Sequence, residues 1–424
     1  MKTKTSICIT FGVFTVFLIL AACITASALT LDQAIELAQQ NLPSYKAAEL
    51  QIRAKEELYK ATFGDYIPRL DVSSNHRKYF NSGNDYTTRS YDAALSYTLF
   101  DGGKRDAARN ISRLNLDIQR FELKKSYIDL SYNVKTIFFM ALAKNESVQQ
   151  RIVQLQDAQK DYEVAEGRYK FGVAKLSDAL QASVRLEQAR FNLVEAENNL
   201  RKAVVQLNSI IGRTLDTPYD LVGSLSESYP DENRTALEQS ALQKPEIKQA
   251  EQKQSIAEFN KQNELSIFYP TFSAEAGYTK TSGGSRSSAT ISGENKSGLI
   301  VAKWNIFELG RYHKVKAARH EIDVSAENLK EVKRQVLLTL GLAFEDYTTA
   351  VNNMKVAQQQ LKQAQQNYDQ AFGEYKVGKA DILSLVQAES QLASAREQLI
   401  NTKLNLVNSR IELEKVSGTE LSWR

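Results

Sequence analysis

The 424-residue chain carries one sequence plan twice, and this repetition restricts its possible folds more than any other feature. Four short motifs of the first half return about 202 to 207 residues later. The pairs are Pro43–Ala48 with Pro245–Ala250, Tyr66–Pro68 with Phe268–Pro270, Leu99–Gly103 with Ile306–Gly310, and Tyr169–Gly172 with Tyr375–Gly378. Repetition at a nearly fixed offset indicates a structural unit built twice. The two units are expected over about 30–213 and 235–418.

In the first unit, assigned to residues 29–213, the spacing of apolar residues changes from a helical to a strand pattern and back. Apolar residues at helical spacing come first, Pro68 then marks entry into extended structure, and a two-fold alternation follows. The predicted elements are a helix over 31–65, strands over 69–79 and 90–100 around an exposed loop at 81–85, a long helix over 104–170, and a helix over 178–211 after the turn at Gly172.

The second unit, assigned to residues 237–418, follows the same order. Its predicted elements are a helix over 237–267, strands over 271–281 and 298–307 around an exposed loop at 282–297, a long helix over 311–376, and a helix over 382–416. A linker over 214–236 separates the two units, and residues 419–424 form a short tail.

Helix lengths predict the shape of the molecule. Each long helix spans roughly 100 Å, and the two shorter helices of a unit span about the same when stacked end to end. The four strands leave two open sheet edges, which lipid does not tolerate, so three copies with 12 strands would close a barrel. The predicted fold class is mainly α with a small β part: a trimeric 12-stranded β-barrel joined to an α-helical barrel of antiparallel coiled-coil helices, which the family resemblance described below places in the periplasm.

The N-terminus has the pattern of a secretory signal peptide. Lys2 and Lys4 precede an apolar run over 11–22, and the small residues of 26–28 follow, so residues 1–28 are expected to be cleaved off. The segment ending in Cys23 also fits a lipoprotein signal, in which this cysteine would be acylated. Cleavage after residue 28 would leave the mature chain without cysteine, because the other cysteine also lies in the signal.

Composition argues against catalytic activity and against nucleic-acid binding. The formal net charge is +4, and Lys and Arg alternate with Asp and Glu along the helices, as on solvated helix faces. His76, His313 and His320 are the only histidines and do not share a metal-binding spacing. No nucleophile with a base, phosphate loop or zinc motif is present. We therefore expect no enzyme, no cofactor, no metal site and no nucleic-acid partner.

Three groups of residues resemble the TolC family of outer-membrane efflux proteins over essentially the whole mature chain. They are the opening segment Leu29–Ala38, the turn Phe100–Arg105, and the two Tyr-Lys-x-Gly turns followed by Asp178 and Asp381. The resemblance implies a homotrimer in outer-membrane lipid that extends into the periplasm, with an equatorial region formed by 214–236 and the C-terminus. It also implies docking to a periplasmic adaptor protein and an inner-membrane pump, as the exit duct of a tripartite efflux or type I secretion system.

The resemblance also predicts the site residues. Adaptor docking is expected at the helix-turn tips, which are Phe171, Gly172 and Val173 in the first unit and Val377, Gly378 and Lys379 in the second. The periplasmic aperture is expected to be lined by Asp178, Gln181, Asp381, Ser384 and Gln387, with Lys379 nearby. Family members usually carry acidic residues at the positions of Ser384 and Gln387 and an arginine at the position of Ala380, so the second unit departs from the family pattern.

One alternative function shares the long helices. A periplasmic coiled-coil adaptor or scaffold protein would have the same helical pattern, but it would not need two pairs of strands compatible with lipid. The sequence does not identify the transported substrate.

Overall fold

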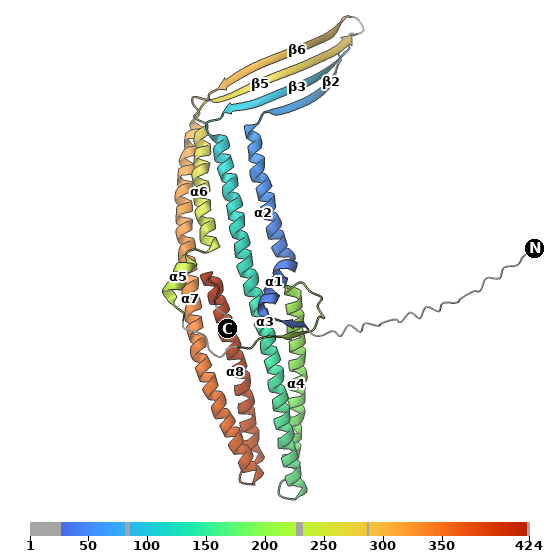
Figure 1. Ribbon diagram of the computed structural model, residues 1–424, viewed down its shortest axis with the longest axis vertical. Coiled ribbons are helices and arrows are strands. Elements are labelled where there is room, and N and C mark those ends of the chain that lie inside the picture. The colour runs from blue at the N-terminus through green and yellow to red at the C-terminus, as the bar shows by residue number, and fades with distance from the viewer. Residues whose placement is uncertain (1–26, 81–84, 226–231, 286–287, 422–424) are drawn as a thin grey trace, which may run out of the picture.

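Two long helices run along most of the length of an elongated molecule. The structure is a computed structural model that describes residues 27–80, 85–225, 232–285 and 288–421. Helices α3 (Lys104–Lys170, 67 residues) and α7 (Leu309–Lys376, 68 residues) each span roughly 100 Å. Shorter helices stack end to end beside them: α2 (Pro43–Ala61) and α4 (Leu176–Ile210) along α3, and α6 (Pro245–Ser266) and α8 (Ile382–Ser417) along α7 (Figure 1).

A four-stranded antiparallel sheet lies at one end of the helices, and the helix-turn tips lie at the other (Figure 1). Its order is β2 (Arg69–Tyr79), β3 (Tyr86–Phe100), β5 (Thr271–Ser285) and β6 (Ser288–Lys303). The central pair β3–β5 joins the two repeats. Within the described chain, β2 and β6 each pair on one side only, so both outer edges of the sheet are open.

The strand register gives the sheet one apolar and one polar face. Leu70 lies opposite Leu95, which lies opposite Ala276, so apolar residues form a row across three strands. On the other face Asp92 accepts hydrogen bonds from the Thr279 hydroxyl at 2.9 Å and from the Ser90 hydroxyl at 3.0 Å. Because side chains alternate between faces, this separation follows from the register.

Small side chains fill the contacts between paired helices. Buried alanines recur at intervals of seven residues or a multiple of seven: Ala158 and Ala165 in α3, Ala182, Ala189, Ala196 and Ala203 in α4, Ala343, Ala350, Ala357 and Ala371 in α7, and Ala388 and Ala395 in α8. A strict seven-residue repeat imposes a left-handed supercoil, which keeps one stripe of each helix against its partner. The hairpins α3–α4 and α7–α8 are therefore closely packed coiled coils.

The middle of the molecule contains shorter elements. They are β1 (Ser27–Leu29), α1 (Leu31–Asn41), β4 (Tyr219–Leu221) and α5 (Arg234–Ala241), and β1 pairs with β4 in parallel. The predicted equatorial linker over 214–236 thus contributes β4 and the start of α5. Thr30 caps α1 in a capping box, and Asn233 caps α5.

Two predicted helices are interrupted. The helix over 31–65 is divided into α1, α2 and a 3-10 turn at Thr62–Tyr66, and the helix over 237–267 is divided into α5 and α6. Both breaks occur before a proline, because proline disfavours the helical conformation of the preceding residue and suits a first helical turn. Leu42 and Lys244 are accordingly non-helical. The second of these helices also begins at 234 rather than 237, and the limits of the other four helices agree with the prediction within two residues.

Three strands differ from their predicted limits. The differences are β3 from 86 rather than 90, β5 to 285 rather than 281, and β6 over 288–303 rather than 298–307. The predicted loop over 282–297 is therefore wrong, because Ser282 pairs with Ser292 in an extended β5–β6 hairpin. Backbone groups make the ladder, so a run of Ser, Thr and Gly pairs without apolar alternation. The predicted loop at 81–85 lies almost wholly outside the described residues.

Among the residues that the structure describes, no helix has both the length and the apolar character needed to cross a membrane.

The β1–β4 pair bears on how the N-terminus is processed. Residues 1–26, including Cys23, lie outside the described part. Leu29 is only 2% exposed, and its carbonyl accepts a hydrogen bond from the Val222 amide at 3.0 Å. A chain that begins at Leu29 keeps both contacts, although it loses two of the three β1 residues.

From the signal-peptide pattern, and because the Leu29 contacts survive this cleavage, we predict that the mature protein begins at Leu29 and carries no lipid. Intact mass spectrometry of protein purified from outer membranes measures this directly. A mass that includes an acylated Cys23 would contradict the prediction and would retain all of β1.

Candidate functional site

The two helix-turn tips have the same backbone geometry. Gly172 and Gly378 adopt the left-handed conformation, with φ of +72° and +79°. In the first tip the Gly172 amide donates to the Tyr169 carbonyl and the Val173 amide to the Arg168 carbonyl, both at 2.9 Å. The second tip repeats this pair of bonds with Gly378 and Lys379. This is the Schellman motif, which satisfies the last carbonyls of a helix and places glycine where a Cβ would be strained.

The predicted docking residues lie exposed on these tips. Phe171 is 85% exposed, Val173 65% and Val377 68%, so each protomer presents apolar side chains to solvent at both turns. Lys379 is also exposed and supplies a positive charge beside Val377. Apolar side chains this exposed pack little against their own protomer, so they are available for contact with another chain.

The predicted aperture residues lie on the first turns of α4 and α8. Gln181, Ser384 and Gln387 are exposed, whereas Asp178 is half-buried. Asp381 caps α8 and accepts from the Ser384 amide at 2.9 Å and from the Ser384 hydroxyl at 2.7 Å.

These aperture residues form two separate groups in the protomer. Hydrogen bonds from the Ser384 amide and hydroxyl lower the pKa of Asp381, so this carboxylate stays charged as a helix cap. Within the described chain, no hydrogen bond or ion pair joins the α4 group to the α8 group.

Arg168, which sequence analysis did not single out, joins the two tips. It projects from the last turn of α3, donates to the Tyr375 carbonyl near the end of α7, and places its guanidinium carbon 4.5 Å from the centre of the Tyr375 ring. Tyr375 is 1% exposed, and this burial raises its pKa. A cation beside the C-terminal carbonyls of a helix is favoured by the helix dipole, and the aromatic face adds a cation–π contact.

Arg168 and Tyr375 are 207 residues apart, close to the repeat offset in this region. Positions one residue away from equivalence in the two units therefore meet at the seam between the hairpins, although nothing in the spacing alone indicates which pairs make contact. Ion pairs farther from the tips also join α3 to α8. They are Arg396–Asp157 at 3.1 Å, Arg151–Glu397 at 3.0 Å and Lys403–Glu146 at 2.7 Å.

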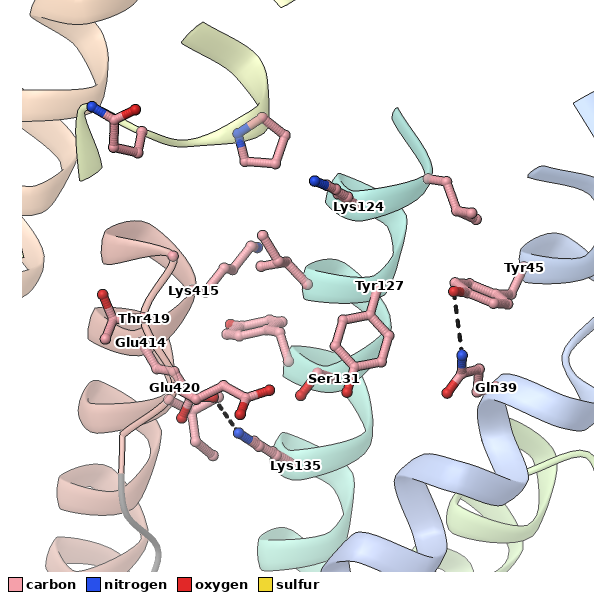
Figure 2. A pocket seen from close by; sticks show the side chains of 17 residues that line it. Gln39, Tyr45, Lys124, Tyr127, Ser131, Lys135, Glu414, Lys415, Thr419 and Glu420 are labelled. Atoms are coloured by element: carbon pink, nitrogen blue, oxygen red, sulfur yellow. Dashed lines mark hydrogen bonds and ion pairs between the residues drawn. The ribbon is translucent and has the colours of Figure 1, made fainter. Parts of the chain in front are cut away.

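A cavity of about 610 Å³ lies at the equatorial joint where α8 ends and α6 begins. Figure 2 shows Lys135 and Glu414 paired at its edge, with Tyr127 and Ser131 on the same wall. The ion pair is largely buried and connects α3 to the end of α8. Within the described residues, no group of three or more His, Cys, Asp or Glu side chains is arranged to hold a metal ion.

Comparison with known proteins defines the class. The chain matches the family model described as "Outer membrane efflux protein" over residues 34–213 and 236–419. These segments cover most of the chain and coincide with the two repeats, so the protein belongs to the outer membrane efflux protein family. It is an outer-membrane efflux channel that extends into the periplasm, and it is not an enzyme. The TolC resemblance is confirmed, and the alternative of a periplasmic adaptor or scaffold is wrong.

Curated relatives and solved structures agree with this assignment. The pyoverdine export outer membrane protein OpmQ of Pseudomonas aeruginosa is 24% identical over 392 residues, covering 85% of this chain and 79% of the relative. Outer membrane protein TolC of Escherichia coli is 21% identical over 379 residues, covering 85% and 76%. The structure of CusC superposes with a TM-score of 0.80 at 19% identity over 92% of both chains. The open-state MtrE channel of Neisseria gonorrhoeae gives 0.76 at 16% identity, over 92% and 89%.

We predict that Arg168→Ala loosens the contact between the tips and raises single-channel conductance in planar bilayers. A lost charge-assisted hydrogen bond of about 1–2 kcal/mol changes a conformational equilibrium about 5–30-fold. Arg168→Lys keeps the charge but not the planar fork, so its effect should be intermediate. Arg190→Ala, which removes an exposed i,i+3 ion pair on α4, is the matched control. Equal conductance of Arg168→Ala and the control would refute a role for Arg168 at the tips.

Proposed function

We propose that the protein acts as a homotrimer that forms the exit duct of a tripartite efflux or type I secretion system, together with a periplasmic adaptor protein and an inner-membrane pump. The observation that carries the proposal is the open four-stranded sheet at one end of helices roughly 100 Å long. A protomer with two unpaired edges is incomplete in lipid, where unpaired backbone groups cost several kcal/mol each.

Three copies complete the sheet in this proposal. The β2 edge of one protomer pairs with the β6 edge of the next, which gives 12 strands and no free edge. The strands contain 11 to 16 residues, enough to cross a bilayer at a tilt. The apolar face that carries Leu70, Leu95 and Ala276 then faces lipid, and the face that carries Asp92 lines the water-filled interior.

Aromatic side chains support this placement of the membrane. Trp304 is 58% exposed and Phe307 82% exposed just after β6, where the sheet joins the helices. Phe100 and Phe272 lie beside each other at the same end of the sheet, with ring centres 6.4 Å apart. Aromatic side chains of this kind collect at the boundary between lipid and water, so this level corresponds to the periplasmic membrane surface.

We expect adaptor docking at the two tips. Val173→Asp combined with Lys379→Glu places six new acidic groups on the tips of a trimer and removes apolar and positive contacts. Export in cells should fall to the level of a deletion strain, and the adaptor should no longer co-purify. Trimers should persist, because both residues are exposed in the protomer.

Lys330→Glu is the matched control, because Lys330 is exposed on α7 far from the tips. Its export should equal that of the wild-type protein. Normal export by the double variant would place adaptor docking elsewhere, and an absence of trimers in the wild-type protein would overturn the duct itself.

The aperture is a second part of the proposal. In the trimer, Ser384 and Gln387 line the narrowest ring, while Asp178, Gln181, Asp381 and Lys379 lie close to it. Ser384 and Gln387 are exposed and face away from the core of the α7–α8 hairpin, which supports this assignment. A neutral ring flanked by threefold-repeated acidic residues would attract cations without a fixed charge at the constriction.

We predict that Ser384→Arg and Gln387→Arg each lower single-channel conductance several-fold and reduce cation preference, because each adds three positive charges to a narrow ring. Gln370→Arg, which adds the same charge at an exposed position of α7, should change neither value appreciably. Wild-type conductance and selectivity in both α8 variants would place the constriction at another level.

A further inference from the structure

Three polar side chains are buried together in the seam between the two hairpins. Asp161 of α3 is 5% exposed, Tyr368 of α7 is 7% exposed and Glu389 of α8 is 8% exposed. The Tyr368 hydroxyl donates to Asp161 Oδ1 at 3.1 Å. Asp161 Oδ2 is buried and has no hydrogen-bond partner within the described chain. This orphaned oxygen is unusual, because buried carboxylate oxygens are normally satisfied.

The neighbouring cations compensate Asp161 only in part, because Lys160 favours its ionised form but burial and the nearby acids outweigh this attraction. Asp157, one turn before it on α3, forms ion pairs with Arg396 of α8 at 3.1 Å and with Lys160 at 3.7 Å. Both cations are therefore shared with another carboxylate. Asp157 also adds negative charge beside Asp161.

Glu389 and Arg185 complete the charged groups that face Asp161. Glu389 repels a charge on Asp161, and Arg185 of α4 acts on Glu389. A buried carboxylate beside a second acid is destabilised when ionised, because burial removes water and the neighbour repels its charge.

We propose that Asp161 is a proton-binding site that controls how tightly the α3–α4 and α7–α8 hairpins pack against each other. With the proton bound, Asp161 is a neutral acid, which is less costly to bury in the seam than a charged one. The protonated Oδ2 also becomes a hydrogen-bond donor. When the proton leaves, the seam holds an uncompensated charge, which favours separation of the hairpins. Asp161 lies about 14 Å from the end of α3, so a change there reaches the tips directly.

The direction of the pH dependence follows from the burial of the carboxyl. Burial, followed by repulsion from Glu389, raises the pKa of Asp161 from 3.8 to about 7. Burial raises the pKa of Glu389 as well. Because the pKa of Asp161 is raised in the packed seam, its stabilising contribution is complete at pH values below the ordinary carboxyl pKa. This contribution is lost as the pH rises to about 7. Acidification therefore closes the seam, and neutral to alkaline pH loosens it.

Hydrogen exchange of the purified full-length trimer in detergent tests this inference without measuring export. After correction for the intrinsic exchange rate, protection of amides around 155–165 and 385–395 should fall by up to about tenfold per pH unit between pH 5 and 7 and then level off. Asp161→Asn, a neutral isostere, should reduce the dependence to the part that Glu389 contributes, and the double variant Asp161→Asn/Glu389→Gln should abolish it. Glu389→Gln removes the repelling charge and should move the transition to lower pH.

Glu163→Gln provides the matched control, because Glu163 is an exposed acid two residues along the same helix. It should retain the wild-type pH dependence. A wild-type seam with no pH dependence, or an Asp161→Asn seam that keeps the full wild-type dependence, would overturn the inference. The proton-binding site itself does not depend on the proposed duct, and only its effect on transport through the channel rests on that proposal. A pH-dependent seam in a protein that fails to conduct would refute the duct and leave the proton site standing.

Discussion

The open edges of the four-stranded sheet are the constraint on which the rest of the molecule depends. Strands β2 and β6 each present a row of backbone N–H and C=O groups that their own protomer does not pair. Water would satisfy these groups, but lipid cannot. An isolated protomer is thus suited neither to the membrane, because of its edges, nor to water, because of its apolar sheet face. In the proposed trimer, association of identical chains pairs the edges and lipid covers the apolar face, and the long helices follow the sheet into the same threefold arrangement.

The internal duplication would make the proposed trimer nearly sixfold. Each protomer contributes two hairpins of similar length, and they meet through positions one residue out of register with the repeat, as the Arg168–Tyr375 and Asp161–Tyr368 contacts show. An arginine or a carboxylate on one side of the seam therefore faces a tyrosine on the other. In the proposed trimer, six similar hairpins would thus form two chemically different kinds of seam, within and between protomers, and these could respond separately to pH or to a partner.

Most of the fold was predictable from the sequence, and the limits of that success have physical causes. The limits of α3 were predicted correctly because the glycine at each end interrupts a long helical period. The first part of β6, over 288–297, was predicted as loop because its mainly polar and glycine residues lack the apolar alternation that marks a strand, although their backbone groups still pair. The tips were predicted from Gly172 and Gly378. Arg168 and Asp161 were missed, because contacts between residues 207 positions apart depend on the relative rotation of two helices.

The alanine stripes determine the mechanical properties of the tunnel wall. Burying one methyl or methylene group stabilises a contact by about 0.8 kcal/mol, whereas a fully buried leucine contributes about 1.5–3 kcal/mol. Near its tip the α3–α4 hairpin buries mainly these alanines with Leu186, whereas the α7–α8 hairpin buries Tyr375, Leu385 and Leu392. Sliding or unwinding α4 along α3 therefore exposes less apolar area than the same movement in α7–α8. The two hairpins of a protomer thus differ in stiffness, and in the proposed duct deformation is concentrated in the α3–α4 hairpins.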